Sequence, residues 1–332
     1  MGATTPISLF ALNATREFGV RMADVLGIDH SNHEEREFED GEHKSRSLAN
    51  VRGRDVFVVQ SLCGDERMSV NDKLCRLLFF LGSLKDAGAM RTTAVVPYLC
   101  YMRKDRKTKP RDPVTTRYLA RLFEAVETDR IMTIDVQNLQ AYQNGFRCRT
   151  EHLEAQPLFV DYCTEAFGNS DLAVMSPDAG GVKPAEQFRQ RLERAMNRDI
   201  PLVFMEKQRS GDVVSGETVV GAVEGKTVIV IDDMISSGTT VQRAAKGCLE
   251  RGAVEVRALA THAAFTEKTE HNLRDPVIER VAVTNTIPMV RGSGDLGGGK
   301  LDLLDAAPLF AEAIKRVHNG GSLVELLNSV DR

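Results

Sequence analysis

The sequence has 332 residues, of which 42% are hydrophobic and 27% are charged. This length corresponds to about two domains at ~100–200 residues each, and the composition argues against disorder, collagen and coiled coil. The 43 basic and 47 acidic residues give a net charge of −4, which offers no support for a general binder of nucleic acid or of a membrane surface.

The first twenty residues lack the basic start and the apolar run of about 7–15 residues that a secretory signal needs. No stretch approaches the ~20 uninterrupted apolar residues of a membrane span, so a cytoplasmic location is expected. The six cysteines are scattered without CxxC spacing, so neither a zinc site nor a disulfide scaffold is predicted.

Short β-branched runs alternate with helical patterns along the chain. Several runs are continuously apolar, as are strands that are buried on both faces of a parallel sheet. The repeated order predicts an open α/β architecture with mostly parallel sheets. The expected strands are 55–60, 92–97, 131–135, 172–176, 202–205, 227–231, 256–261 and 280–284, and the expected helices are 71–87, 113–126, 184–196 and 240–251.

A break near 145–160 separates two such series. Asn144-Gly145 is a turn signal, and the residues that follow are mostly polar with no clean period. Two domains are therefore predicted, 1–150 and 151–305. The tail, 306–332, contains an amphipathic helix-turn-helix that could pack on either domain as far as its own sequence tells.

The strongest functional signal is VIVIDDMISSGTT, residues 228–240. A buried strand ends in two carboxylates and is followed at once by a Ser/Gly/Thr turn that opens a helix. Backbone N–H groups and hydroxyls at a helix N-terminus suit a phosphate, and glycine allows close approach. Two acids at the carboxyl end of a strand could hold ribose hydroxyls and a metal. A plainer alternative is a helix N-cap after solvated aspartates. The candidates are Asp232, Asp233, Ser236, Ser237, Gly238, Thr239 and Thr240.

This motif resembles the loop by which type I phosphoribosyltransferases and ribose-phosphate pyrophosphokinases grip ribose 5-phosphate. Four further segments resemble the pyrophosphokinases, also called phosphoribosyl pyrophosphate synthetases, and extend the likeness over nearly the whole chain. The resemblance implies two similar phosphoribosyltransferase-type domains, the first binding ATP and the second ribose phosphate, with the tail packing back on the first. The four segments are REFEDGE, PYLCYMRKDRK with RDPVTTR, SPDAGGVK and EKQRS.

Two of these segments are implied to bind ATP. The first maps an aromatic face and two carboxylates, Phe38, Asp40 and Glu42, onto adenine recognition, although alone it would be interpreted as a solvated acidic turn. The second begins where a strand ends, and its guanidinium groups suit polyphosphate, with a solvated basic loop as the alternative. It implies that the triphosphate contacts are Arg103, Lys104, Asp105 and Arg106.

The other two segments are implied to carry the metal and the catalytic cations. Asp178 maps near the ribose and the metal, and Lys207 and Arg209 map onto transition-state cations that alternate along a strand extension. One departure is serious: where the family has Asp-x-His-x-x-Gln, this chain has DVQNLQ, with Gln137 at a position that serves the metal and triphosphate. An amide cannot bind a metal as imidazole does.

The implied reaction moves the β,γ-diphosphoryl group of ATP to the anomeric hydroxyl of ribose 5-phosphate, with Mg²⁺, in a homo-oligomer, either a hexamer built from dimers or a dimer. No nucleic acid or membrane partner is expected. Three alternatives stay open at this point. They are a paralogue acting on another 5-phosphorylated ribose such as ADP-ribose, a phosphoribosyltransferase, and a weakly active or regulatory synthetase-like subunit.

Overall fold

The computed structural model describes residues 5–168, 170–210, 213–289 and 299–328, and for 207–210 and 213–217 it describes the backbone only. The chain forms two compact units. The first contains Met1–Glu154, Thr286–Pro288 and Ala306–Leu326, and the second contains Ala155–Asn285, Met289–Asp305 and Leu327–Arg332.

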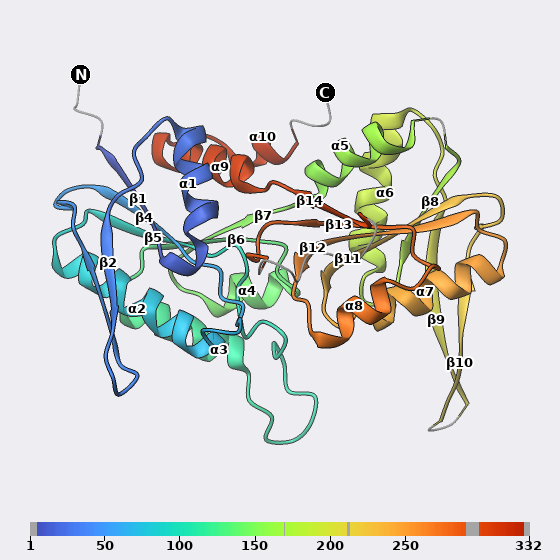
Figure 1. The fold of residues 1–332 in the computed structure, drawn as a ribbon, viewed down its shortest axis with the longest axis horizontal. Coiled ribbons are helices and arrows are strands. Elements are labelled where there is room, and N and C mark those ends of the chain that lie inside the picture. Colours follow the sequence, from blue (N-terminus) through green and yellow to red (C-terminus); the bar gives the residue numbers. More distant parts are fainter. Residues whose placement is uncertain (1–4, 169, 211–212, 290–298, 329–332) are drawn as a thin grey trace. The chain divides into compact units, whose positions relative to one another are not determined.

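The first unit is built on a parallel five-stranded sheet in the order β1-β4-β5-β6-β7. Helices α2 and α3 cover one face of this sheet, and α1 and α9 cover the other (Figure 1). The strands are β1 (Ile7–Ala11), β4 (Asp55–Val59), β5 (Arg91–Val95), β6 (Arg130–Ile134) and β7 (Arg149–Leu153), and the helices are η1 (Asn13–Thr15), α1 (Arg16–Leu26), α2 (Val70–Asp86), α3 (Thr115–Ala125), α4 (Leu139–Gly145), α9 (Ala307–Asn319) and α10 (Leu323–Leu327).

A separate antiparallel hairpin in this unit joins β2 (His33–Glu37) to β3 (His43–Ser47).

The tail helix α9 belongs to the core of the first unit. Its Phe310 packs edge-on against Phe18 of α1, with ring centroids 5.6 Å apart. At its last turn, Nδ1 of His318 lies 2.7 Å from Oδ2 of Asp55, a fully buried carboxyl group at the start of β4 that also pairs with Arg91. Apolar packing and a buried polar contact therefore both fix the tail to this unit.

The second unit is built on a seven-stranded sheet in the order β10-β9-β8-β11-β12-β13-β14, in which only the β9–β10 pair is antiparallel. Helices α5 and α6 lie on one face, and α7 and α8 on the other (Figure 1). The strands are β8 (Leu172–Ser176), β9 (Leu202–Ser210), β10 (Val213–Val220), β11 (Thr227–Ile235), β12 (Glu255–Ala263), β13 (Arg280–Thr284) and β14 (Leu301–Leu304), and the helices are α5 (Gln156–Phe167), α6 (Val182–Met196), α7 (Thr239–Glu250) and α8 (Glu267–Leu273).

The predicted fold class is confirmed, since both units are α/β with mostly parallel sheets. Two local expectations differ from the structure. The polar stretch near the expected break contains an edge strand, β7, whose residues are half-buried or exposed except at its end. In addition, β11 runs to Ile235, so Asp232 and Asp233 lie inside a strand instead of after one. Among the described residues, no helix is long and apolar enough to span a bilayer.

Candidate active site

The loop between β11 and α7 depends on one glycine. Gly238 has φ +76°, a left-handed conformation that favours glycine. A Cβ atom placed there would lie 2.9 Å from Cδ2 of Leu273 in α8. Glycine is therefore required at this position both for the turn and for the close approach of α8. The structure thus shows a packing role for this glycine, while its close approach to a ligand stays a prediction.

Helix α8 holds this loop from the side. Nδ2 of Asn272 donates to the carbonyl oxygen of Ser237 at 2.8 Å, and the hydroxyl of Thr269 donates to the carbonyl oxygen of Ser236. Nδ2 of Asn272 also lies 3.2 Å from Oγ1 of Thr239. The first N–H groups of the 12-residue α7 have no partners within the helix, so the loop and the helix start form a braced cradle of donors that suits an anion.

Two carboxyl groups lie just before this cradle. Oδ1 of Asp232 accepts from the backbone N–H of Asp233 at 2.9 Å. Burial raises the pKa of Asp232, and the carboxylate of Asp233, followed by the more weakly acting Asp178, raises it further. Because these like charges disfavour one another, the neighbourhood favours an added cation. Three carboxylates, two from the end of β11 and one from the turn after β8, thus act on one region of the second unit.

Asp178 lies in the turn between β8 and α6 and is exposed. Its Oδ1 accepts from the backbone N–H groups of Gly180 and Gly181, both at 2.9 Å, and its carbonyl oxygen accepts from the hydroxyl of Ser176. Side chains at the two glycines would crowd this arrangement, since a Cβ on Gly181 would meet Oγ of Ser176 at 2.8 Å. The turn therefore fixes one carboxylate oxygen and leaves the other for a ligand.

These oxygen donors suit a hard divalent cation. Within the described part of the chain, however, no three His, Cys, Asp or Glu side chains lie close enough to hold a metal ion by themselves. Small divalent cations such as Mg²⁺ are commonly held by one or two carboxylates together with substrate phosphates. The residues present therefore fit a metal that is bound together with its phosphorylated substrate.

The raised pKa of Asp232 predicts a pH dependence of stability. The folded chain holds this proton more tightly than the unfolded chain, so the free energy of unfolding should fall as pH rises above the unfolded value of about 4, by at most about 1.4 kcal/mol per pH unit. Chemical denaturation in chelator at several pH values measures this slope. Asp232→Asn should remove it and the exposed Asp199→Asn should not; equal slopes in both variants would contradict the prediction.

The two predicted catalytic cations lie on β9. The backbone of Lys207 pairs with Glu217 of β10, and that of Arg209 pairs with Val214. Residues two apart in a strand lie on the same face. Their side chains lie outside the described residues.

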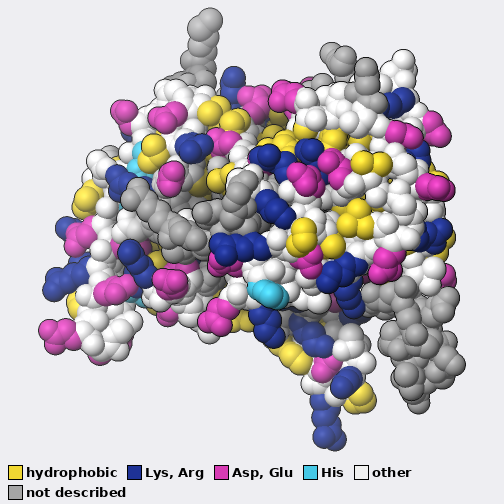
Figure 2. Space-filling model, turned by 45° about the vertical axis from the view of Figure 1, so that its right-hand side comes forward, with side chains coloured by type: hydrophobic (Ala, Val, Ile, Leu, Met, Phe, Trp, Pro, Cys, Tyr) yellow, Lys and Arg dark blue, Asp and Glu magenta, His cyan; other side chains and the backbone are white. Residues whose placement is uncertain are grey.

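In the first unit, the predicted triphosphate loop lies between β5 and α3. Figure 2 shows Lys and Arg side chains gathered on the loop that projects at the bottom, and Arg103 and Arg106 are exposed. Lys104 differs from them, because its Nζ lies 2.7 Å from Oδ2 of Asp112. The side-chain hydrogen bonds from Lys104, which has the larger effect, and from Thr108 hold the pKa of the Asp112 carboxyl group well below its usual range. Lys104 thus braces the loop.

Asn138 connects this loop to the segment after β6. Its Nδ2 donates to Oδ2 of Asp105, and its Oδ1 accepts from the backbone N–H of Ala141 at 3.0 Å, which caps α4. Gln137 precedes Asn138 and is exposed. The structure thus brings the predicted residues Asp105 and Gln137 into one neighbourhood. Sequence reasoning did not single out Asn138, although an Asn before a short helix is a common N-cap.

The predicted adenine-contacting residues lie at the tip of the β2–β3 hairpin. Phe38 is 41% exposed, and the guanidinium of Arg36 lies 5.3 Å from the centroid of its ring. Oδ1 of Asp40 accepts from the backbone N–H of Glu42 at 3.1 Å, which shapes the turn. An exposed aromatic face therefore stands beside two exposed carboxylates.

Comparison with known proteins matches both units. A model of the N-terminal domain of ribose phosphate pyrophosphokinase matches residues 7–126, and one of the phosphoribosyl synthetase-associated domain matches residues 172–328. A ribose-phosphate pyrophosphokinase from Caldanaerobacter subterraneus subsp. tengcongensis is 35% identical over 97% of this chain and 98% of its own length. The chain belongs to the ribose-phosphate pyrophosphokinase family.

Other members of this pyrophosphokinase family are similar to the chain over nearly its whole length. The Gloeobacter violaceus enzyme is 36% identical over 96% of this chain and 92% of its own. The crystal structure of phosphoribosylpyrophosphate synthetase from Mycobacterium smegmatis has a TM-score of 0.86 and 34% identity, covering 96% of this chain and all of that one. The family and fold expected from the motifs are confirmed, while the roles of individual residues stay predictions.

Proposed function

We propose that this chain forms 5-phosphoribosyl 1-pyrophosphate and AMP from ATP and ribose 5-phosphate through the residues described above. The observation that supports this best is the cradle at the start of α7. A left-handed Gly238, braced by α8, opens a helix directly after two interacting carboxyl groups. A sugar that carries both hydroxyls and a 5-phosphate matches this pairing of acids with N–H donors.

On the ribose side, Asp232 and Asp233 accept hydrogen bonds from ribose hydroxyls, and the cradle residues bind the 5-phosphate. Backbone N–H groups and hydroxyls supply the donors, and the helix dipole favours the negative charge. The cradle residues are Ser236, Ser237, Gly238, Thr239 and Thr240.

On the ATP side, Phe38 stacks on adenine while Asp40 and Glu42 accept from its exocyclic amine. Arg103 and Arg106 bind the triphosphate, because planar guanidinium groups donate to phosphate oxygens in pairs. Lys104 and Asp105 hold the loop through Asp112 and Asn138, which keeps the two arginines in place.

The reaction joins the anomeric oxygen to the β-phosphorus of ATP and breaks the bond to the oxygen shared with the α-phosphorus, while the anomeric hydroxyl loses its proton. Lys207 and Arg209 neutralise charge on the transferred group as it forms. Mg²⁺ would supply further charge neutralisation when bound. The residues proposed to hold it, together with phosphate oxygens, are Asp178 and, at the position of the family's histidine, Gln137.

The chain is also proposed to act in the cytoplasm as a homo-oligomer, either a hexamer built from dimers or a dimer. The exposed ring of Phe38 at the tip of a hairpin supports this state, because an adenine there would have one open face. Light scattering measures the oligomeric state.

The function is tested by following AMP release from ATP with ribose 5-phosphate, with ADP-ribose and with no acceptor. We expect release with ribose 5-phosphate well above the other two arms. Release that is equal in all three arms would mark simple hydrolysis, and preference for ADP-ribose would overturn the proposed acceptor.

Gln137 offers a second test. We expect Gln137→His to increase AMP formation from ATP and ribose 5-phosphate, because imidazole supplies a metal ligand or charged donor that an amide cannot. Gln143→His, which adds the same group at an exposed position six residues on and outside the Asp-x-His-x-x-Gln motif, is the matched control and should change nothing. No gain from Gln137→His would indicate that this site is adapted to glutamine.

A further inference from the structure

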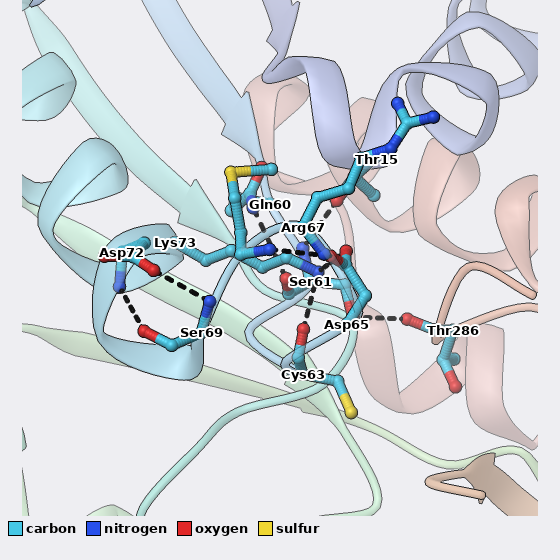
Figure 3. Close-up of polar contacts among 11 residues, drawn as sticks. Thr15, Gln60, Ser61, Cys63, Asp65, Arg67, Ser69, Asp72, Lys73 and Thr286 are labelled. Atoms are coloured by element: carbon cyan, nitrogen blue, oxygen red, sulfur yellow. Dashed lines mark hydrogen bonds and ion pairs between the residues drawn. The ribbon is translucent and has the colours of Figure 1, made fainter. Parts of the chain in front are cut away.

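Lys73 is a buried cation with no place in the reaction just described. It lies in the first turns of α2, and its side chain is only 3% exposed. Its Nζ lies 2.6 Å from Oδ2 of Asp65 and 2.6 Å from the carbonyl oxygen of Cys63 (Figure 3). Burying an ammonium group costs free energy unless it is paired, so the lysine and this loop depend on each other.

The loop that Lys73 holds runs from Gln60 to Ser69 and follows β4 at the carboxyl edge of the first sheet. Oδ1 of Asp65 accepts from the backbone N–H groups of Arg67 and Met68 at 2.8 and 2.9 Å, so the aspartate folds the loop around itself. The loop thus has one internal centre, and Lys73 is bound to it.

The same loop is bound to the beginning of the triphosphate segment. The backbone N–H of Leu62 donates to the carbonyl oxygen of Tyr98 at 2.9 Å. Carboxyl ends of neighbouring parallel strands meet at one edge, and β4 pairs with β5 throughout its length. If residues 62–65 moved, Tyr98 would therefore move with them.

Arg103 interacts with both segments, with Tyr98 after β5 and with Cys63 in the loop after β4. Burial raises the pKa of Tyr98, and Arg103 opposes the shift through its charge and a side-chain hydrogen bond. Burial also raises the pKa of Cys63, opposed by the charges of Lys73 and then Arg103. Arg103 therefore makes a side-chain hydrogen bond with Tyr98 and acts on Cys63 through its charge.

We propose that Lys73 is a positioning residue for ATP binding. By fixing Cys63 and Asp65 it holds in place the loop that is bound to Tyr98, the hydrogen-bond partner of Arg103. The inference relies on the proposed function, in which Arg103 contacts the phosphates of ATP. Without Lys73, Asp65 and the carbonyl group of Cys63 lose the cation that holds the loop to α2. Arg103 then samples more positions, and more ordering free energy is lost when ATP binds. Ribose 5-phosphate binding, assigned to the second unit, is not affected.

The test compares Lys73→Met with a matched change on the same helix. Lys85 also makes an ion pair, with Asp129, at 2.6 Å. Lys85 lies near the end of α2, however, and Asp129 lies just before β6 begins. We expect Lys73→Met to raise KM for ATP about tenfold, with kcat and KM for ribose 5-phosphate changed less than about twofold. Lys85→Met should leave all three constants unchanged.

A second variant guards against unfolding, because a lone buried charge is strongly destabilising. The double change Asp65→Asn with Lys73→Met removes both charges and should show the same rise in KM for ATP. If both Lys73 variants lower thermal stability but leave KM for ATP unchanged, the lysine is merely structural and the inference is wrong.

Arg103→Ala separates this inference from the function on which it rests. If it leaves KM for ATP unchanged, the assignment of Arg103 fails, and the inference fails with it. If it raises KM while the Lys73 variants do not, only the inference fails. Combining Arg103→Ala with Lys73→Met should raise KM no further than Arg103→Ala alone, since Lys73 acts through Arg103; fully additive effects would overturn the inference.

Discussion

Replacing Lys207 or Arg209 by alanine should lower kcat by as much as ~10³-fold while changing the dissociation constant of ATP far less. The reason is that these cations are proposed to meet charge that is present only while the diphosphoryl group is in transit. Both residues lie in β9, two positions apart. Single-turnover kinetics together with binding of a non-hydrolysable ATP analogue measures the two quantities separately.

The matched control for these variants is Lys226→Ala. Lys226 belongs to the same unit and makes an ion pair at 2.6 Å with the exposed Asp171. This control should keep full turnover. Equal losses of ATP binding and turnover in Lys207→Ala and Arg209→Ala would instead identify these cations as anchors of the bound substrate.

Gly238→Ala should raise KM for ribose 5-phosphate by ~10–100-fold, the effect of losing about one charge-assisted contact to the 5-phosphate. An alanine there has an unfavourable left-handed backbone, and its methyl group also meets Leu273. Because Leu273 is fully buried, we expect this contact to push the cradle away from α8 and to stretch its hydrogen bonds to Asn272. Steady-state kinetics with each substrate varied in turn measures the change.

Gly225→Ala is the control for backbone strain alone. Gly225 has φ +73° in the same unit, and a Cβ atom there would meet nothing within 4 Å. It should cost about 1–2 kcal/mol of stability from the left-handed backbone and leave both KM values unchanged. If Gly238→Ala behaved in the same way, the contact with α8 would be irrelevant to substrate binding.

The strand, turn and helix around the proposed phosphate cradle could be predicted from sequence because their determinants are local. An apolar strand, a hydroxyl-rich turn, a glycine and a helix follow one another within 23 residues of chain, from Val228 to Glu250. The brace supplied by Thr269 and Asn272 could not be predicted, because these residues lie 33 and 35 positions from the carbonyl groups they bind. Only the packing of α8 against α7 brings them there.

The charge pattern also predicted only part of the loop after β5. The run of basic residues after β5 indicated an anion-binding loop, and Arg103 and Arg106 are exposed there. Net charge alone did not reveal that Lys104 pairs with Asp112, eight residues on. Strand β7 was missed because a polar edge strand has too little continuous apolar surface to be told from a loop by pattern alone.

The docking of α9 has a consequence for biosynthesis. Phe18 and Asp55 emerge early from the ribosome, but their partners Phe310 and His318 are made more than 260 residues later. At ~5–20 residues per second, the nascent first unit waits at least several seconds after its own last strand before this helix can cover it. During that interval apolar side chains of α1 and a buried carboxyl group stay uncovered. Shortening the protein from its C-terminal end far enough to remove α9 would therefore leave the fold of its N-terminal half incomplete.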